Sequence, residues 1–372
     1  MSGKYLILTA SIGAGHIRAA EAVRDALQKK LPRADIPIID CTERHISLFS
    51  WLQKIFYLKM LALVPNLYDI FYRLAGGKSA GHLARLAFAL TLLPGVCAVL
   101  RKYRPDTVIC THPFPAGAAA LGKKLAVGNY TLAIVLTDYS VHEVWLYRQA
   151  DVYFTATEEM QRTFVAAGFP ASCVHPVGIP VSGNIITAPT QAEAKAKLHI
   201  PPHNKVVLLM GGGLGLGHME ATLAALNSLS LPLTVLAITG KNKRLQARLE
   251  KFAASVSTNV ALRLWGYTDQ IPLLMSAADV LITKPGALTM SEAMIGGLPL
   301  ILVEPIPGPE ADNAKFAVSA GAAIWPKAQE NLAAVVDGLL RDEQRLAALS
   351  QAARKIAKPQ AAEQIASRLM GE

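Results

Sequence analysis

The sequence has 372 residues, too many for one ordinary hydrophobic core and enough for two domains. Apolar residues make up 52% of it and charged residues only 17%, which excludes an intrinsically disordered chain. The net charge of +10 is concentrated in residues 44–104, where nine basic residues and one acid, Asp69, alternate with aromatic and long aliphatic side chains. Nucleic-acid binding favours an exposed polar stripe of basic residues, which this mixture does not form. Basic residues interleaved with apolar ones suit an anionic membrane surface instead.

The first apolar segment, residues 4–9, predicts a buried strand that leads into a glycine-containing loop and a helix. Gly13 and Gly15 let the backbone of this loop turn sharply and approach a ligand. A dinucleotide-binding loop would have a third glycine where the sequence has Arg18. His16 follows at the mouth of the expected crevice, where it either acts as a general base, since its ordinary pKa is about 6.5, or merely caps the helix.

The basic window contains two long apolar segments. Residues 46–72 combine a broad apolar face with a narrow polar stripe, and Lys59 interrupts the apolar side. Residues 83–100 form an 18-residue run that barely reaches the length of a spanning helix and contains Arg85 and Pro94, so a transmembrane helix is disfavoured. Core helices are one reading of this window, but its charge favours a surface that dips into an anionic membrane.

Polar loops follow the remaining strands expected in the first half of the chain. These strands are predicted at residues 105–111, 131–136, 152–155 and 174–177. The carboxyl ends of parallel strands meet at one edge of a sheet, which would bring acid–base side chains from separate loops close to His16. The side chains concerned are His112, Asp138 and His142.

A second domain is expected after an Ala/Lys-rich segment with three prolines, residues 184–203, which is typical of a linker. The strand at residues 205–210 leads into residues 211–217, in which five glycines free the backbone amides to surround a diphosphate. No Lys-Ser/Thr pair follows, so this loop is not an NTP-hydrolysing P-loop. A later strand, residues 261–264, leads to Tyr267, whose backbone is placed to pair with a flat base edge.

The most informative segment is a βαβ unit formed by strands at residues 280–283 and 300–303 and a helix that opens at about Leu288. Its loops and first helical turn carry a set of polar residues: Lys284, Thr289, Glu292, Glu310 and Asn313. The helix N-terminus suits an anion, and a carboxylate one turn later suits the hydroxyls of a ribose. The alternative is an ordinary βαβ unit whose polar residues only cap the helix.

The C-terminal part predicts a strand at residues 322–325 and two polar helices, the last broken by Pro359 so that a final helix crosses back to the first domain. No cleavable signal segment precedes the first expected strand, and the four cysteines lack metal or disulfide spacing. We therefore expect a protein of the reducing cytoplasm.

The order of these motifs resembles the diacylglycerol glucosyltransferase and monogalactosyldiacylglycerol synthase family, which belongs to glycosyltransferase family 28. The residues that carry the resemblance span nearly the whole chain: Ser11-Ile-Gly-Ala-Gly-His16, Thr111-His112-Pro113-Phe114-Pro115, Thr137-Asp138 with His142 and Trp145, Gly178-Ile-Pro180-Val, Gly211-Gly212-Gly213, Lys284-Pro285-Gly286-Ala-Leu-Thr289 with Glu292, and Pro307-Gly308-Pro309-Glu310 with Asn313. The resemblance implies a GT-B fold of two Rossmann-like, doubly wound parallel-sheet domains facing a cleft. It places an acceptor domain at residues 1–186, a nucleotide-sugar domain at 187–357 and a returning helix at 358–372.

By this resemblance the chain is an inverting hexosyltransferase that moves sugar from a UDP-sugar to a lipid hydroxyl, most simply diacylglycerol, at the cytoplasmic face of the membrane. The implied donor-binding residues are Gly15, Gly211, Gly212, Gly213, Tyr267, Lys284, Gly286, Ala287, Leu288, Thr289, Glu292, Glu310 and Asn313. The implied acceptor and membrane residues are Trp51, Lys54, Phe56, Lys59, Phe71, His112, His142 and Trp145. His16 is the expected base, with Asp138 either orienting it or serving as the base itself.

Two departures from the family pattern concern the donor: Ala287 replaces a glycine, and Pro309 replaces a glutamine whose amide would contact the sugar. No Asp-x-Asp motif occurs, so neither a metal-held diphosphate nor any other cofactor is expected. Three alternatives remain at this stage: transfer to a polyprenyl-diphosphate lipid, epimerisation of a UDP-sugar, and a membrane-bound UDP-sugar sensor without turnover.

Overall fold

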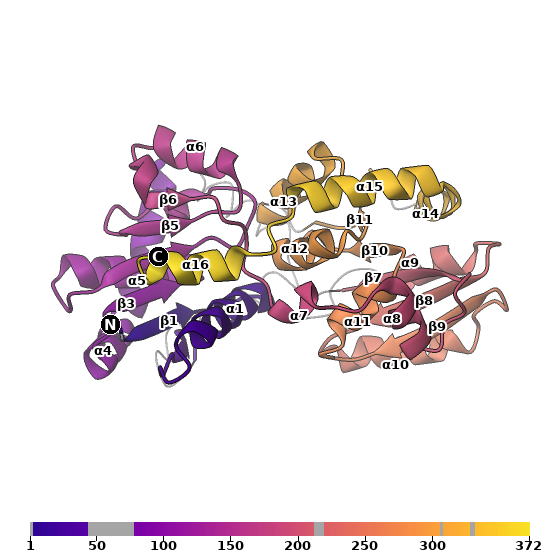
Figure 1. Cartoon of the computed structure of the whole chain (residues 1–372), viewed down its shortest axis with the longest axis horizontal. Coiled ribbons are helices and arrows are strands. Elements are labelled where there is room, and N and C mark those ends of the chain that lie inside the picture. The colour runs from indigo at the N-terminus through magenta and orange to yellow at the C-terminus, as the bar shows by residue number, and fades with distance from the viewer. Residues whose placement is uncertain (1–2, 44–77, 212–218, 306–307, 328–331) are drawn as a thin grey trace. The chain divides into compact units, whose positions relative to one another are not determined.

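The computed structural model describes residues 3–43, 78–211, 219–305, 308–327 and 332–372. Its contacts divide the chain into two compact α/β units, each built on a parallel sheet (Figure 1). The first unit comprises Met1–Ser182, Pro307–Pro309 and Lys358–Glu372, and the second comprises Gly183–Ile306 and Glu310–Ala357. The fold class expected from the sequence, two doubly wound parallel-sheet domains, is confirmed.

The sheet of the first unit has six strands in the order β2-β1-β3-β4-β5-β6, and every pairing among them is parallel. The strands are β1 Tyr5–Thr9, β2 Ile38–Asp40, β3 Thr107–Cys110, β4 Thr131–Val135, β5 Val152–Phe154 and β6 Val174–His175. The chain leaves β1 for β2 on one side and returns to β3 on the other. The β1–β3 boundary is therefore the topological switch point, where doubly wound sheets place their ligands.

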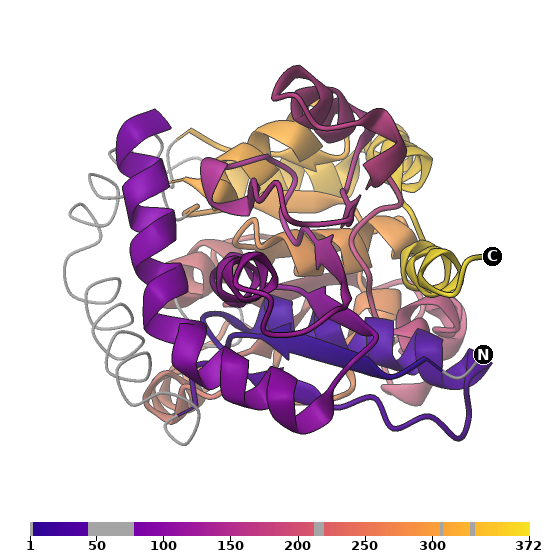
Figure 2. The ribbon, with the colours of Figure 1, turned by 90° about the vertical axis from the view of Figure 1, so that its left-hand side faces the viewer.

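Helices pack on both faces of this sheet. They are α1 Ala14–Lys30, α4 Lys78–Tyr103, α5 Pro113–Lys124, α6 Glu158–Ala166 and α16 Ala361–Leu369, with 3-10 turns η1 Glu143–Trp145 and η2 Ala171–Cys173. Alternate strand residues such as Ile7 and Ile109 share a core with α1 and α16, as the two-residue period of a strand requires. Figure 2 shows α4 and α5 together on the other side of the sheet from α1 and α16.

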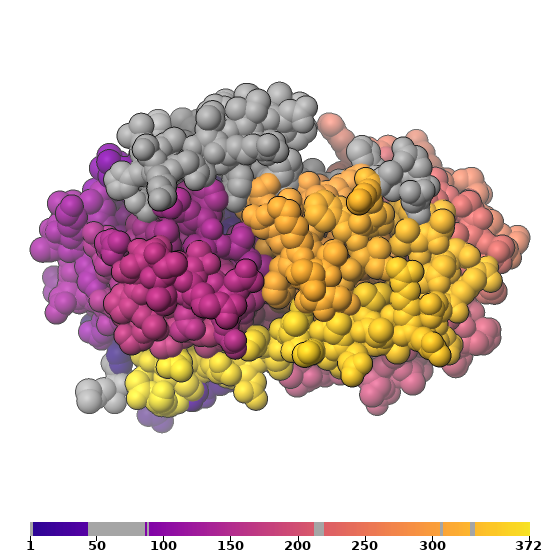
Figure 3. Space-filling model, turned by 90° about the horizontal axis from the view of Figure 1, so that it is seen from above, coloured from indigo at the N-terminus to yellow at the C-terminus, as the bar shows by residue number. Residues whose placement is uncertain are grey.

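The C-terminal helix α16 belongs to the first unit, and its Ala362, Ile365 and Ala366 are buried against α1 and the sheet. The segment that leads into α16 passes close to Gly178, which has a φ of +104°. A Cβ added at Gly178 would lie 2.4 Å from the Cβ of Lys358. In the space-filling view the yellow C-terminal residues lie against the magenta part of the first unit (Figure 3). The glycine of the Gly-Ile-Pro-Val motif is thus required by packing as well as by backbone conformation.

The second unit repeats the architecture with the strand order β12-β11-β10-β7-β8-β9, again parallel throughout. Its strands are β7 Lys205–Met210, β8 Leu233–Ile238, β9 Val260–Trp265, β10 Val280–Thr283, β11 Leu300–Leu302 and β12 Ala323–Ile324. The central strands are apolar without alternation because helices bury both of their faces. The helices described in this unit are α7 Gly183–Ile186, α8 Gln191–Lys197, α9 Met219–Asn227, α10 Lys243–Ala253, α11 Ile271–Ala277, α12 Ala287–Gly296, α13 Pro309–Ser319, α14 Leu332–Arg341 and α15 Glu343–Ile356.

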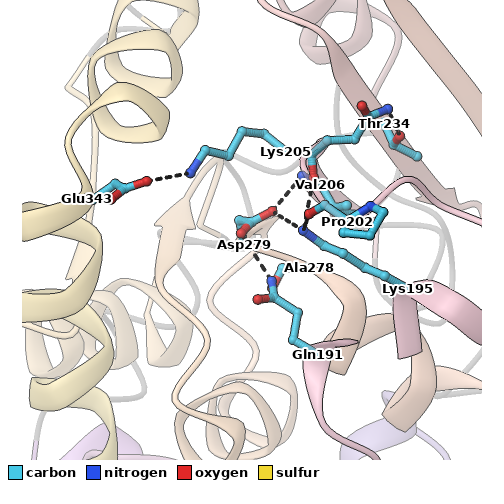
Figure 4. A network of polar contacts seen from close by, with 10 residues as sticks. Gln191, Lys195, Pro202, Lys205, Val206, Thr234, Ala278, Asp279 and Glu343 are labelled. Atoms are coloured by element: carbon cyan, nitrogen blue, oxygen red, sulfur yellow. Dashed lines mark hydrogen bonds and ion pairs between the residues drawn. The ribbon is translucent and has the colours of Figure 1, made fainter. Parts of the chain in front are cut away.

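The segment expected to be a linker, residues 184–203, is instead part of the second unit and contains α7 and α8. A capping box between Thr190 and Glu193 starts α8. Lys195 is then buried, with its Nζ 3.4 Å from Asp279 Oδ2 and 2.9 Å from the carbonyl oxygen of Asn204 (Figure 4). The high proline and lysine content suggested a linker, but this ion pair fixes the segment to the sheet.

Asp279 accepts hydrogen bonds from three directions at the amino ends of β7 and β10. Its Oδ2 accepts from the Val206 amide at 2.7 Å, and its Oδ1 accepts from Gln191 Nε2 at 3.1 Å (Figure 4). The buried Lys195 ammonium and the partly buried Asp279 carboxylate therefore both have polar partners, as charges withdrawn from water require.

Within the described residues, no helix has both the length and the apolar character needed to span a membrane. The apolar run at residues 83–100 lies in α4, which continues through Pro94 and ends at Tyr103.

Candidate active site

The switch point of the first sheet brings His16 into contact with the ends of two strands. His16 lies in the first turn of α1, and its Nδ1 is 2.9 Å from the carbonyl oxygen of Thr111, directly after β3. The same Nδ1 is 2.8 Å from the Oγ1 of Thr137, which follows β4. Thr111 also holds the main chain of His16, because its Oγ1 lies 2.9 Å from the His16 carbonyl oxygen. The histidine is thus fixed at both its backbone and its ring.

These contacts define which ring nitrogen carries the hydrogen. A carbonyl oxygen can only accept, so Nδ1 of His16 donates to the carbonyl of Thr111 and Nε2 keeps its lone pair. A lone pair on Nε2 is the requirement for a general base, provided that the ring is neutral. Of the two expected roles of His16, capping the helix is not the one seen, since the N-cap position of α1 is Gly13 and makes no side-chain cap bond.

The surroundings of His16 keep its ring neutral at ordinary pH. Burial is the largest influence and lowers the pKa of His16, while the negative charge of Asp138 and the hydrogen bond to Thr111 oppose it. The net pKa is lowered. Asp138 therefore lies close enough for its carboxylate to stabilise the protonated ring once a proton has been taken up.

His112 stacks against His16 but has a different local role. The two ring centroids are 4.4 Å apart in an edge-on arrangement. His112 is the N-cap of α5, where its Nδ1 accepts from the Phe114 amide at 3.2 Å. Burial, followed by the proximity of His16, lowers the pKa of His112 well below its ordinary value. The cap and the burial together make His112 a neutral neighbour that adds no positive charge beside His16.

The other two predicted acceptor residues of this region lie around η1. His142 caps this turn by accepting from the Val144 amide at 3.5 Å. Trp145 is only 3% exposed, so its indole belongs to the packed interior of the unit. The five residues predicted for the membrane surface, Trp51, Lys54, Phe56, Lys59 and Phe71, lie outside the described residues.

A polar cluster at the end of β2 was missed by the sequence analysis. Oδ1 of Asp40 accepts from the Ser11 amide at 3.2 Å, the Thr42 amide at 2.9 Å and the Thr42 hydroxyl at 2.6 Å. Burial works to raise the pKa of Asp40, but these hydrogen bonds outweigh it and lower the pKa. Asp40 thus ties β2 to the loop that carries the two glycines and His16.

In the second unit, the turn before α12 presents backbone amides at the carboxyl edge of the sheet. Gly286 is the N-cap of α12 and provides no side-chain cap, so Ala287, Leu288 and Thr289 open the helix with amides available to a ligand. Glu292, one turn later, is 5% exposed. These residues have the arrangement that an anion at a helix N-terminus requires.

Two more predicted donor residues lie in α13, a helix that the sequence analysis treated as a loop. Its first turn contains Glu310, and its Asn313 is fully buried. Nδ2 of Asn313 donates to the carbonyl oxygen of Pro285 at 3.2 Å, which connects α13 to the turn before α12. Asn313 therefore shapes the turn that contains Lys284 and Gly286.

Two of the remaining predicted donor residues, Gly211 and Tyr267, follow strands of the second sheet. Gly211 follows β7, and its amide donates to the carbonyl of Ile238 at 3.5 Å. Tyr267, after β9, is 64% exposed, with Lys241 Nζ 5.1 Å from its ring centroid. Gly15 lies in the first turn of α1 in the other unit. Gly212 and Gly213 lie outside the described residues.

The fold is the one that GT-B glycosyltransferases share. MurG of Acinetobacter baumannii superposes with a TM-score of 0.66 at 18% identity, covering 100% of both chains. Anabaena HepE in complex with UDP-glucose superposes with a TM-score of 0.58 at 17% identity, covering 99% of both chains. At these identities the likeness establishes the fold.

The particular family follows from sequence comparison. Residues 16–181 match the monogalactosyldiacylglycerol (MGDG) synthase family, and residues 206–365 match the glycosyltransferase family 28 C-terminal domain. The processive diacylglycerol β-glucosyltransferases of Bacillus cereus (strain AH187) and Bacillus cytotoxicus are 30% and 31% identical over 99% of this chain and 94% of theirs. The chain belongs to this family of hexosyltransferases, and the resemblance drawn from its motifs is confirmed.

Proposed function

We propose that this enzyme transfers a hexose from a UDP-sugar to the hydroxyl of 1,2-diacylglycerol and inverts the anomeric centre to give a β-glycolipid. The observation that carries the proposal is the hydrogen bond from Nδ1 of His16 to the carbonyl of Thr111, which leaves Nε2 as a base. The names of the relatives, diacylglycerol β-glucosyltransferases, support the acceptor and the product. The UDP-glucose complex of HepE supports the donor class.

The donor would bind at the carboxyl edge of the second sheet. The amides of Ala287 to Thr289 and the positive end of α12 suit the diphosphate, and Lys284 adds a cation beside them. Glu292 suits the ribose hydroxyls, and the backbone near Tyr267 suits the uracil. Glu310 in the first turn of α13 and the neighbouring Pro309 would lie near the sugar. Because Pro309 lacks a side-chain amide, recognition of the hexose must depend on contacts from other residues.

The chemical step then needs one base and one stabilised leaving group. Nε2 of His16 takes the proton of the acceptor hydroxyl while the hydroxyl oxygen forms a bond to the anomeric carbon of the donor. The bond from that carbon to the β-phosphate oxygen breaks on the opposite face, and UDP leaves with the electron pair. The Asp138 carboxylate stabilises the imidazolium formed, and amides and helix dipoles stabilise the UDP oxyanion.

We further propose that the enzyme acts at the cytoplasmic face of the membrane. The excess of basic residues between Arg44 and Arg104, interleaved with apolar ones, suits an anionic leaflet that holds the acceptor. Each basic side chain near such a surface contributes about 1 kcal/mol of attraction. The family resemblance assigns His112 and His142 to the acceptor, and Trp51, Lys54, Phe56, Lys59 and Phe71 to the membrane.

The test is incubation of the purified protein with diacylglycerol in anionic vesicles and, separately, with UDP-glucose, UDP-galactose and UDP-N-acetylglucosamine. We expect glycolipid and UDP to appear together with one preferred donor, and β-configuration of the product by NMR. Transfer to a polyprenyl-diphosphate lipid but not to diacylglycerol would contradict the acceptor. Donor epimerisation, or UDP binding without turnover, would contradict the reaction itself.

A further inference from the structure

Thr137 is the second group that holds the ring of His16, and the family motifs assign it no role. Its Oγ1 lies 2.8 Å from Nδ1 of His16, although 121 residues separate them in the sequence. The Thr137 side chain is 5% exposed, so water does not replace this contact freely. A specific bond between a buried hydroxyl and a reactive imidazole calls for an explanation.

The direction of this bond is fixed by the other partner of Nδ1. Because Nδ1 donates its hydrogen to the carbonyl of Thr111, it has no lone pair left to accept from a hydroxyl. Thr137 Oγ1 is therefore an acceptor that shares the same N–H with Thr111. Two acceptors, one after β3 and one after β4, fix the rotation of the imidazole and so the direction of Nε2.

We propose that Thr137 is a positioning residue that holds the His16 base in its productive orientation and stabilises its protonated form. The proposal rests on the function proposed above, in which His16 takes the acceptor proton. When the ring becomes imidazolium, Nδ1–H becomes a charged donor, and hydrogen bonds from charged donors are roughly twice as strong as neutral ones. Thr137 thereby acts most strongly in the transition state, when the charge develops.

A neighbouring threonine shows what a purely structural hydroxyl does at a comparable place. Thr155 directly follows β5 and is also fully buried, but its Oγ1 donates to the nearby carbonyl of Thr157 at 3.3 Å. Such a local bond satisfies a buried hydroxyl without reaching another element. Thr137 differs because its bond reaches a side chain on α1.

Besides the Thr137 hydroxyl and the Thr111 carbonyl, two titratable groups of the described residues, Asp138 and His112, influence the His16 ring. Asp138 raises the pKa of His16, and His112 lies against the ring as a neutral neighbour. Removing the Thr137 oxygen leaves the Thr111 carbonyl and the Asp138 charge in place. The loss of turnover should therefore be smaller than the loss caused by removing His16. It should arise both from a less well oriented imidazole and from a less stabilised imidazolium charge.

The kinetic test compares Thr137→Val, Thr137→Ser and the matched control Thr155→Val. We expect Thr137→Val to lower kcat by about 10- to 100-fold, the range for one hydrogen bond to a charged group, with KM for the donor nearly unchanged. Thr137→Ser should restore most of the activity. Since the valine variant stabilises imidazolium less, the acid limb of its kcat profile should move to lower pH. Equal losses in Thr137→Val and Thr155→Val, or an unmoved acid limb, would refute the assignment.

A second measurement does not depend on turnover. In protein with ¹⁵N-labelled histidine, the shifts of the two ring nitrogens report the tautomer, and His16→Gln identifies the signals of His16. We expect the Nδ1–H form in the native protein, and in Thr137→Val the same tautomer, held by the Thr111 carbonyl, with a lower His16 pKa read from the pH dependence of the shifts. A native-like His16 pKa in that variant would overturn the proposal even if the protein transferred sugar. Absence of glycolipid from the native enzyme, with the expected spectra, would instead overturn only the proposed function.

Discussion

Asn313 and Pro285 join two segments of the proposed donor site: the buried amide of Asn313 donates to the Pro285 carbonyl across 3.2 Å. Asn313→Ala removes this bond and should cost about 1–3 kcal/mol of unfolding free energy. Because the turn before α12 loses its support, the affinity for UDP should also fall, by about tenfold. Calorimetric binding and thermal unfolding measure the two effects.

A matched control is Asn227→Ala, which removes an acceptor for the Ser257 amide at 2.7 Å in the same unit. It should lower stability without weakening UDP binding. If both variants bound UDP equally well, the role of Asn313 in shaping the turn would be refuted.

His16→Ala should lower turnover by about 10²–10⁴-fold and leave UDP affinity nearly intact, because the imidazole acts on the acceptor proton. Since burial lowers the pKa of His16, the native acid limb should lie below the ordinary histidine value of about 6.5. Because the base must be neutral to accept a proton, activity should rise as the pH increases through the pKa of His16. A pH–rate profile of both proteins checks this, and unchanged turnover in the variant would remove His16 from the mechanism.

Lys195→Met should destabilise the second unit, by about 1–3 kcal/mol, because it leaves the partly buried Asp279 carboxylate without its cation. The exposed Lys197 lies on the same helix, and Lys197→Met should change stability by less than about 0.5 kcal/mol. Urea unfolding of the two variants measures the difference. Equal midpoints would show that the ion pair does not fix α8 to the sheet.

Gly178→Ala should loosen α16, since the new methyl group would overlap the Lys358 side chain and the residue has a φ of +104°. We expect a loss of about 1–3 kcal/mol from strain and displaced packing. Hydrogen exchange should accelerate in residues 358–372. Gly338→Ala is the control, because a methyl group there meets no atom within 4 Å and an alanine favours its helix.

The enzyme should retain full activity after treatment with EDTA. This prediction comes from the sequence, which has no Asp-x-Asp pair to hold a metal on the diphosphate, and from the amides and Lys284 available to take its charge. Activity is measured before and after chelation, with added Mg²⁺ and Mn²⁺ as the reverse test. A loss of activity after chelation that added Mg²⁺ or Mn²⁺ restores would contradict the predicted independence from metal ions.

Regular βα alternation made most of the fold predictable from sequence. Apolar segments such as residues 205–210 are buried on both faces, and the helix of the βαβ unit began within one residue of the expected Leu288. Strand β2 was missed, and with it Asp40, because its three residues directly follow a segment with two prolines, Pro32 and Pro37, which is typical of a loop. Helix α13 was missed because Pro309 was read as part of a loop, although proline is favourable in the first turn of a helix.

The candidate site was predictable only in its local parts. The glycine loop and His16 are adjacent in sequence, so their proximity was predictable. The partners that fix the His16 ring, Thr111 and Thr137, are 95 and 121 residues away, and only the strand order brings them together. Asn313 likewise looked like a ligand contact, and its bond to Pro285 depends on a helix that the sequence did not reveal.

The return of α16 to the first unit has a consequence for how the protein is made. Ala362, Ile365 and Ala366, which pack against α1, are translated after the whole second unit. Until they are made, the first unit presents an open apolar surface, of the kind that promotes aggregation and recruits chaperones. Premature termination before α16 would therefore damage the unit that contains His16, although most of that unit is translated first.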